Sequence, residues 1–178
     1  MAGAHSVRPA DRGIRDPLFS NVPIVLLVAV WLWRRRRYAA FRQYAFLIAL
    51  GFLVSYLGYL AVPARGPRFL LSHLQHTELK GLWLYRILRL GLDRLESAHY
   101  DCFPSGHTEL TILAWWGSRQ LGKPVFLTYF AYTWSIIFAT VYLRYHYTID
   151  VFAGAVVASS LIFAAPYLYR MLDRGTGH

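Results

Sequence analysis

The sequence predicts an all-α fold: a polytopic transmembrane helical bundle of five or six spans, with one amphipathic helix lying in the membrane interface. Three observations lead to this prediction. The 178 residues are 56% hydrophobic and have a mean hydropathy of +0.33. Only 16% of them are charged, whereas soluble domains average about 25%. Apolar stretches long enough to cross a bilayer recur along the chain.

Three stretches are the clearest predicted spans. Residues 38–62 and 147–168 are each long enough to cross about 30 Å of hydrocarbon at about 1.5 Å per residue. Residues 124–143 also qualify, and they begin with Pro124, which suits the first turn of a helix.

Two further stretches are marginal as spans. Residues 105–121 are short and are interrupted by Arg119. Residues 17–33 carry Asn21 and Pro23, so a re-entrant or surface-lying helix is the alternative for this stretch. Counting both stretches gives five spans.

Residues 79–97 predict the interfacial helix. Charged residues recur on one side of it at helical spacing, with leucines opposite. The charged set is Arg86, Arg89, Asp93 and Glu96. Such a stripe is too charged to cross the membrane, so we expect a helix lying in the outer interface. A helix packed on top of the bundle is the open alternative.

The chain is predicted to be one domain, residues 1–178, in which residues 1–16 form a polar tail without the apolar core of a signal peptide. The basic run Arg34–Arg37 predicts a cytoplasmic loop. Residues 63–104 and the turn at 144–146 then fall on the non-cytoplasmic face. We expect the membrane to be a plasma or inner membrane.

The formal net charge of +10 indicates an anionic partner. In a chain with such apolar runs, it favours a membrane surface or an anionic lipid over nucleic acid. Cys102 is the single cysteine, so an intrachain disulfide and a cysteine-based metal site are both excluded. The sequence does not indicate an oligomeric state.

Three separated segments rich in basic residues or histidine fall on the same predicted face of the membrane. They are VPARGPRF at 62–69, FPSGH at 103–107 and LRYHYTID at 143–150. Composition does not require this coincidence, which therefore indicates a shared site. Arg65 and Arg68 flank a Gly-Pro turn and Arg144 adds a third guanidinium. Guanidinium groups bind phosphate oxygens bidentately.

The segment PSGH also suits an anion. Pro104 fits the first turn of a helix, so the amides of Ser105, Gly106 and His107 would point out of its end. Gly106 would let the backbone approach a ligand closely.

His146 and Asp150 are four residues apart and would share one face of a helix. The carboxylate could then hold the proton of one imidazole nitrogen and leave the other nitrogen free as a nucleophile or base. Each motif alone has an ordinary structural explanation, as a local helix pair, a helix start or a headgroup anchor. Glu109 is two residues from His107, so we expect it on the far side of that helix, hydrogen-bonded to a neighbouring span.

These residues resemble the type 2 phosphatidic acid phosphatase (PAP2) superfamily, whose members share a phosphate site with the vanadium haloperoxidases. The resemblance covers about residues 62–165. PSGH, at 104–107, is similar to the second motif of the family. HYTIDV, which contains His146 and Asp150, is similar to the third, and RGPR, at 65–68, is similar to the first.

The resemblance implies a bundle of about six spans and a reaction that needs no metal or other cofactor. It implies that His146 is the nucleophile, which forms a phosphohistidine, and that Asp150 orients it. His107 would protonate the leaving group and then activate water. The groups that would bind the phosphoryl oxygens are Arg65, Arg68, Arg144 and the Ser105–Gly106 backbone.

The sequence departs from the family pattern at two positions of the phosphate site. Ala61 stands where the first motif has a lysine, and Arg65 is the candidate substitute. Thr140 stands where the third motif has an arginine. Arg144, four residues later, would lie on nearly the same helical face.

The expected function is hydrolysis of a phosphomonoester or pyrophosphate of a lipid at the non-cytoplasmic face, with the lipid substrate and membrane lipids as partners. Phosphatidic acid, phosphatidylglycerol phosphate, undecaprenyl pyrophosphate and a lipid A phosphate are candidate substrates. One open alternative is a lipid phosphotransferase, because HYTIDV is also similar to the third motif of sphingomyelin and inositol phosphorylceramide synthases. Another is a non-enzymatic lipid-binding or transport bundle.

Overall fold

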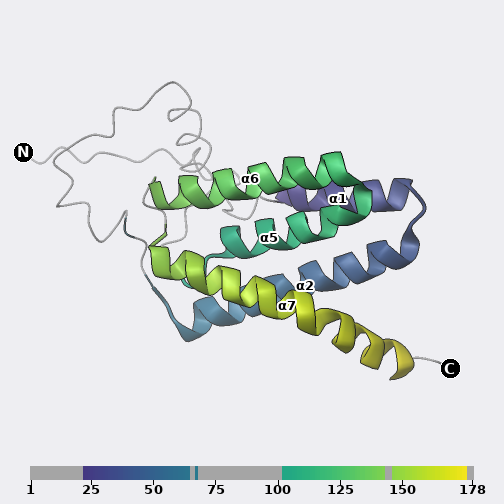
Figure 1. Cartoon of the computed structure of the whole chain (residues 1–178). Helices are drawn as coiled ribbons and strands as arrows, with labels where there is room; N and C mark the ends of the chain where they lie inside the picture. The colour runs from purple at the N-terminus through teal and green to yellow at the C-terminus, as the bar shows by residue number, and fades with distance from the viewer. Residues whose placement is uncertain (1–21, 65–66, 68–101, 143–145, 176–178) are drawn as a thin grey trace, which may run out of the picture.

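The computed structural model describes residues 22–64, 67, 102–142 and 146–175. Its elements are α1 (Val22–Arg34), α2 (Tyr38–Ala61), α5 (Gly106–Ser118), the short 3₁₀-helix η4 (Arg119–Leu121), α6 (Lys123–Tyr142) and α7 (Thr148–Gly175). The predicted all-α helical bundle is confirmed (Figure 1).

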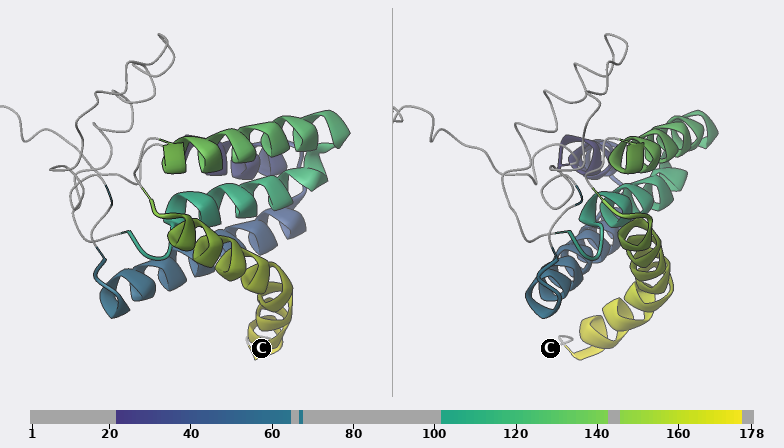
Figure 2. Two further views of the ribbon diagram at one scale, coloured as in Figure 1. Left: turned by 60° about the vertical axis from the view of Figure 1, so that its left-hand side comes forward. Right: turned by 90° about the vertical axis from the view of Figure 1, so that its left-hand side faces the viewer.

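Helix α5 is the centre of the bundle. It packs against α1, α2, α6 and α7, whereas each of the others lies at the periphery (Figures 1 and 2). The side chains of Val28, Leu32 and Leu113 are completely buried where α1 meets α5 and α2. Because α5 begins at one end of the bundle, residues of α2 and α7 lie beside its N-terminus.

Three of the described helices are long and apolar enough to cross a membrane: α2, α6 and α7. Helices α1 and α5 have 13 residues each, which gives a length of about 20 Å. They correspond to the two stretches that were marginal in the sequence. The predicted interfacial helix at 79–97 lies outside the described residues.

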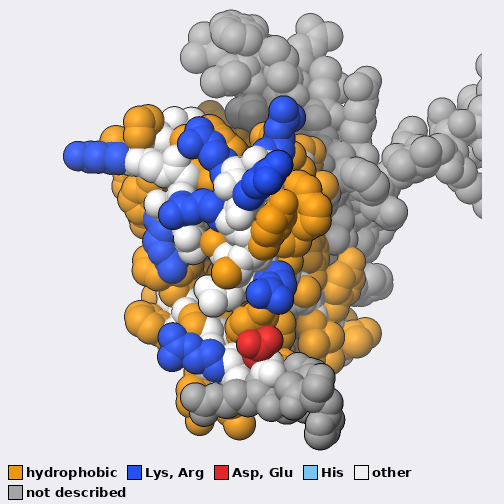
Figure 3. Space-filling model, turned by 90° about the vertical axis from the view of Figure 1, so that its right-hand side faces the viewer, with side chains coloured by type: hydrophobic (Ala, Val, Ile, Leu, Met, Phe, Trp, Pro, Cys, Tyr) orange, Lys and Arg blue, Asp and Glu red, His pale blue; other side chains and the backbone are white. Residues whose placement is uncertain are grey.

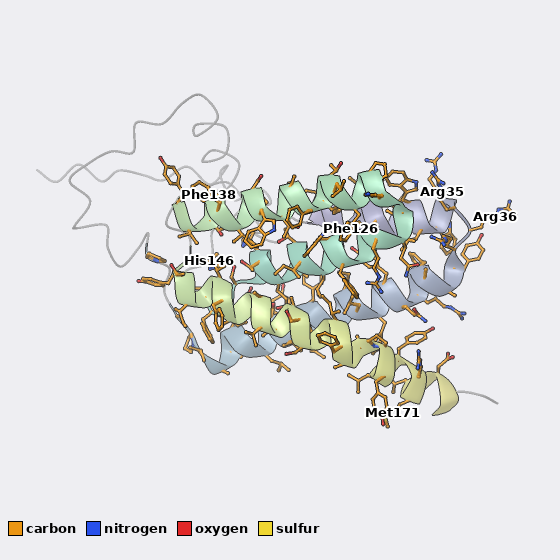
Figure 4. The ribbon with its side chains drawn as sticks, in the orientation of Figure 1. Arg35, Arg36, Phe126, Phe138, His146 and Met171 are labelled. Carbon is orange, nitrogen blue, oxygen red and sulfur yellow. The ribbon has the colours of Figure 1, made fainter. Side chains whose placement is uncertain are left out.

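The outer surface of the long helices is apolar. Phe138 on α6 is 70% exposed and Phe163 on α7 is 83% exposed. Large aromatic side chains on a helix face are costly in water and favourable against lipid tails. Figure 4 shows Phe138 pointing away from the neighbouring helices. The bundle is therefore a membrane protein by the length of its helices and by the nature of its surface.

Helix α7 extends beyond its predicted end. The predicted span stopped at Leu168, but the helix continues to Gly175. It contains Pro166, and its C-terminal part diverges from the bundle (Figure 2). A proline within a helix removes one backbone hydrogen bond and bends the axis without ending the helix.

The two ends of the bundle differ in charge. Exposed basic side chains gather at the end that holds the α1–α2 and α5–α6 connections (Figure 3). They are Arg34, Arg35, Arg36, Arg37, Arg42, Arg119 and Lys123. Figure 4 shows His146 at the opposite end from Arg35 and Arg36.

Candidate active site

The site is built at the N-terminus of α5. The helix begins at Gly106, and Ser105 is its N-cap: the Ser105 Oγ accepts a hydrogen bond from the Thr108 amide at 3.3 Å. The sequence had placed Pro104 in the first helical turn, and this was wrong. Pro104 stands before the cap, after a cis peptide bond with Phe103. Serine is a favoured N-cap because its oxygen satisfies an amide that the helix leaves unpaired.

Helix α7 begins beside this cap. Asp150 lies in the first turn of α7, and its Oδ2 accepts a hydrogen bond from the Tyr147 amide at 2.8 Å. The carboxylate thus reaches back to the residue before the helix, as in half of a capping box. The Ser105 amide donates to the Asp150 carbonyl oxygen at 3.0 Å. This bond joins the starts of α5 and α7.

Three glycines allow the backbone segments around the site to come together. A β-carbon on Gly154 of α7 would lie 2.5 Å from the Ser105 carbonyl oxygen. A β-carbon on Gly58 of α2 would overlap Pro104, and one on Gly106 would overlap the Tyr59 hydroxyl. The expectation was that Gly106 makes room for a ligand, but in the structure the space beside it is filled by Tyr59.

The two histidines of the predicted site meet. His146 Nε2 lies 3.4 Å from His107 Nδ1, and the ring centroids are 5.6 Å apart at an angle of 59°. The residues are 39 positions apart in the chain and come from the start of α5 and the turn before α7. His146 is buried and His107 is partly buried.

The other nitrogen of His146 contacts a backbone carbonyl. Nδ1 is 3.0 Å from the Cys102 carbonyl oxygen and 3.9 Å from Asp150 Oδ2. The sequence predicted that Asp150 holds this nitrogen directly from the same helix face. His146 instead precedes α7, which starts at Thr148. The Cys102 carbonyl is therefore the group that accepts the Nδ1 proton and leaves Nε2 unprotonated.

Cys102 belongs to the site, although sequence reasoning had assigned it no role. Its thiol donates to Asp150 Oδ2 at 2.9 Å and lies 3.6 Å from His146 Nδ1. All three side chains are buried. The signal that could have found it is its position directly before FPSGH, since a residue so close to the start of α5 has to lie near the same helix end.

Burial decides the charge of His146. The pKa of its imidazole is lowered to about 3: removal from water is the largest cause, the neighbouring His107 also lowers the pKa, and the bond to the Cys102 carbonyl acts in the opposite direction. Burial in a medium of low polarity disfavours the charged form of a base. The imidazole is therefore neutral at neutral pH, with one nitrogen free to attack an electrophile.

Glu109 lies away from the histidine pair. It is completely buried, and Ser55 Oγ on α2 donates to its Oε2 at 2.5 Å. The predicted hydrogen bond to a neighbouring span is confirmed. Glu109 stabilises the contact between α5 and α2 and takes no part in the contacts of the site.

Part of the predicted phosphate site lies outside the described residues: Arg65, Arg68 and Arg144. Thr140, at the position of the missing arginine, is buried and donates its hydroxyl proton to the Ile137 carbonyl. One correction concerns the Ser105 amide, which was expected to point out of the helix end. Its hydrogen bond to the Asp150 carbonyl occupies it.

Comparisons with known proteins agree with the motifs. A family model described as the PAP2 superfamily matches residues 19–164, which include α1, α2, α5, α6 and most of α7. No curated protein matches the chain, and no solved structure does. The family model covers most of the chain, and the second and third motifs meet at one end of the bundle. Together these two findings identify the family. The chain belongs to the PAP2 superfamily.

Proposed function

We propose that the protein is a lipid phosphatase that hydrolyses a phosphomonoester or pyrophosphate of a lipid through a phosphohistidine on His146. The observation that carries the proposal is the state of that residue. Its Nδ1 proton is donated to the Cys102 carbonyl, and its Nε2 faces His107 at 3.4 Å. A neutral imidazole with one free nitrogen beside a second imidazole is the arrangement that nucleophilic and acid–base catalysis need.

The reaction has two steps. His146 Nε2 attacks phosphorus and the lipid oxygen leaves, taking a proton from His107, which we propose takes up this proton and becomes an imidazolium when the anionic phosphoryl group binds beside it. His107, now neutral, then removes a proton from water, whose oxygen attacks the phosphohistidine and releases inorganic phosphate. Phosphoryl transfer depends mainly on positioning and on stabilising charge, so the protein need only hold these groups and the phosphoryl oxygens in place.

The two imidazoles have to separate when the substrate enters. In an in-line transfer the attacking nitrogen and the leaving oxygen lie on opposite sides of phosphorus. The nucleophile and the acid are then about 6 Å apart or more, whereas they are 3.4 Å apart in the structure. His107 is only partly buried and stands in the first turn of α5. We propose that its side chain rotates away from His146 to admit the phosphoryl group.

In this proposal, positively charged groups and a helix N-terminus bind the phosphoryl group. The Gly106 amide at the start of α5 lies where the helix dipole favours an anion. Arg65, Arg68 and Arg144 are proposed to neutralise the phosphoryl oxygens, on the strength of their motifs alone. The basic end of the bundle lies opposite to the site (Figures 3 and 4). By the positive-inside rule that end is cytoplasmic, so the reaction is proposed to occur at the non-cytoplasmic face.

The test is phosphate release from a panel of phosphorylated lipids by purified protein in a chelator. We expect turnover by the native chain and none by His146→Ala. With a substrate whose leaving group needs no proton, such as 4-nitrophenyl phosphate, His107→Ala should still transfer the phosphoryl group and accumulate an acid-labile phosphoprotein.

Three outcomes would count against the proposal. They are absence of phosphate release from the whole panel, full activity of His146→Ala, and failure to trap phosphate on the His107→Ala protein. Transfer of the phosphoryl group to an added lipid alcohol in preference to water would instead identify the phosphotransferase. Thr148→Ala, an exposed change at the start of α7, is the matched control for the effect of substitution near the site.

A further inference from the structure

The side chains of Cys102, His146 and Asp150 form a buried cluster of three possible metal ligands. The thiol sulfur, the imidazole Nδ1 and a carboxylate oxygen all lie within 4.8 Å of one another. Sequence reasoning had excluded a cysteine-based metal site because the chain has one cysteine, and this exclusion overlooked sites in which a single cysteine is joined by histidine and aspartate. The cluster stands on the side of His146 that faces away from His107.

The distances suit a tetrahedral ion. Zn²⁺ with bonds of about 2.3 Å to sulfur and about 2.0–2.2 Å to nitrogen and oxygen holds its ligand atoms about 3.4–3.6 Å apart. In the structure sulfur and Nδ1 are 3.6 Å apart, sulfur and Oδ2 are 2.9 Å apart, and Nδ1 and Oδ2 are 3.9 Å apart. The shortest of these distances, from sulfur to Oδ2, is the one in which the thiol proton is shared with the carboxylate. An ion that replaced this proton would increase the distance.

We propose that Cys102, His146 and Asp150 form an inhibitory binding site for Zn²⁺. The donor set of one sulfur, one imidazole nitrogen and one carboxylate oxygen selects Zn²⁺ over Mg²⁺ and Ca²⁺, which bind oxygen ligands. A thiolate and a carboxylate together neutralise the two charges of the ion. The bound site thus has no net charge, which makes its burial tolerable.

Metal binding changes the positions of two protons, and these changes account for the inhibition. The Cys102 thiol loses its proton to solvent when sulfur binds the ion, so one proton is released for each Zn²⁺ bound. His146 Nδ1 binds through its lone pair, and its proton therefore passes to Nε2. Water takes the fourth position of the ion.

The tautomer of His146 links this site to the proposed function, on which the inhibitory part of the inference rests. The reactive nitrogen of the phosphatase is Nε2 without a proton. Once the ion holds Nδ1, Nε2 carries the proton and has no lone pair for phosphorus. Since the phosphoryl group binds on the other side of the ring, we expect Zn²⁺ to lower kcat and to leave KM nearly unchanged.

Binding is tested by titrating chelator-treated protein with Co²⁺, which replaces Zn²⁺ in tetrahedral sites and is coloured. We expect a sulfur-to-cobalt charge-transfer band that saturates at one equivalent and disappears when Zn²⁺ is added. Cys102 is the only cysteine in the chain, so such a band has to come from it. Cys102→Ser and Cys102→Ala should lack the band.

Inhibition is tested on the same samples, with each variant compared with its own rate in chelator. The Zn²⁺ concentration for half inhibition should rise by about 100-fold or more in Cys102→Ala, because even loss of an outer partner of a metal ligand costs about 10–100-fold in affinity. Mg²⁺ should not inhibit. The double variant His73→Ala/His76→Ala, which removes the HLQH pair elsewhere in the sequence, is the control and should keep both the band and the inhibition.

The inference is overturned if the native protein shows no cobalt–sulfur band, or if Cys102→Ala is inhibited at the same Zn²⁺ concentration as the native protein. Failure of the proposed function gives a different result. In that case no lipid releases phosphate in chelator, but the cobalt spectrum still shows whether the three side chains bind a metal.

Discussion

The carbonyl oxygen of Ser105 lies 2.5 Å from the position that a β-carbon on Gly154 would take. This approach places the second turn of α7 against the cap of α5. It is accompanied by the bond from the Ser105 amide to the Asp150 carbonyl. Two backbone segments that carry the two histidines are therefore in direct contact, and the distance between His107 and His146 depends on that contact.

Gly154→Ala should push the two helix starts apart. The obstacle is backbone, which cannot rotate away, and overpacking of this kind costs about 1–3 kcal/mol. We expect a lower melting temperature in detergent and a larger loss in the rate of phosphate release, because His146 moves relative to His107. Ala164→Leu adds bulk at an exposed position of the same helix and is the control. Equal melting temperature and activity in Gly154→Ala and the native chain would show that the contact does not position the site.

Gly106→Ala should be harmful for a different reason, which a second substitution can relieve. The added methyl group would overlap the Tyr59 hydroxyl, while the Tyr59 ring carbon that bears it stands 3.6 Å away, at ordinary contact distance. Removing the hydroxyl therefore makes room. We expect Gly106→Ala to lower both stability and activity, and Gly106→Ala/Tyr59→Phe to recover most of the loss.

The single variant Tyr59→Phe sets the reference for that comparison, measured by the same melting and phosphate-release assays. If the double variant is no better than Gly106→Ala alone, crowding by Tyr59 is not the cause. The glycine would then be required for another reason, such as approach of the phosphoryl group to its amide.

Substitutions of Ser55 and Glu109 should have coupled effects on the free energy of unfolding and little effect on the rate of the reaction. Ser55→Ala leaves a completely buried carboxyl group without its hydrogen bond from α2, and an unsatisfied buried polar group costs about 1–3 kcal/mol. A double-mutant cycle with Glu109→Gln, followed by thermal unfolding, should give a non-zero coupling energy. The kcat of folded Glu109→Gln should stay close to that of the native chain. A loss of kcat with unchanged stability would place Glu109 in the reaction.

Local sequence patterns predicted much of the fold because the hydrophobicity of the sequence falls abruptly at the ends of the helices. The predicted stretch 38–62 differs from α2 by one residue, since the arginine run before it and Pro63 after it bound the apolar segment. The C-terminal end of α7 was not predicted, because the thickness of the hydrocarbon layer limits only the part of a helix that spans the membrane. The helix itself can continue beyond the membrane. Glu109 was placed correctly because two residues of helix turn a side chain by about 200°.

The contacts of the site were less predictable because they depend on where a helix starts. The pairing of His146 with Asp150 assumed that both residues are helical, but the helix starts at Thr148 and the Nδ1 proton goes to a backbone carbonyl. Backbone carbonyls carry no signal in a sequence. Cys102 was missed because a lone cysteine has no spacing pattern, and only the fold brings it to Asp150.

The neutrality of His146 should make the stability of the protein depend on pH. Its pKa is about 3 in the folded protein, against an ordinary value of 6.5. The unfolded chain therefore takes up a proton at this residue as the pH falls below 6.5, and the folded chain does not do so until about pH 3. Since the unfolded state binds more protons, this contribution to stability is present above pH 6.5 and is lost progressively as the pH falls towards 3. The slope is at most about 1.4 kcal/mol per pH unit for one group.

Melting temperatures in detergent between pH 7 and pH 5 measure this effect, and His146→Gln should show a shallower decrease than the native chain because glutamine takes up no proton. His178→Gln, a substitution of the same kind at the last residue, should follow the native curve. If His146→Gln loses stability on acidification as steeply as the native chain, the imidazole is not held neutral by burial. The unprotonated Nε2, on which the proposed phosphohistidine depends, would then not be the main form of the residue at neutral pH.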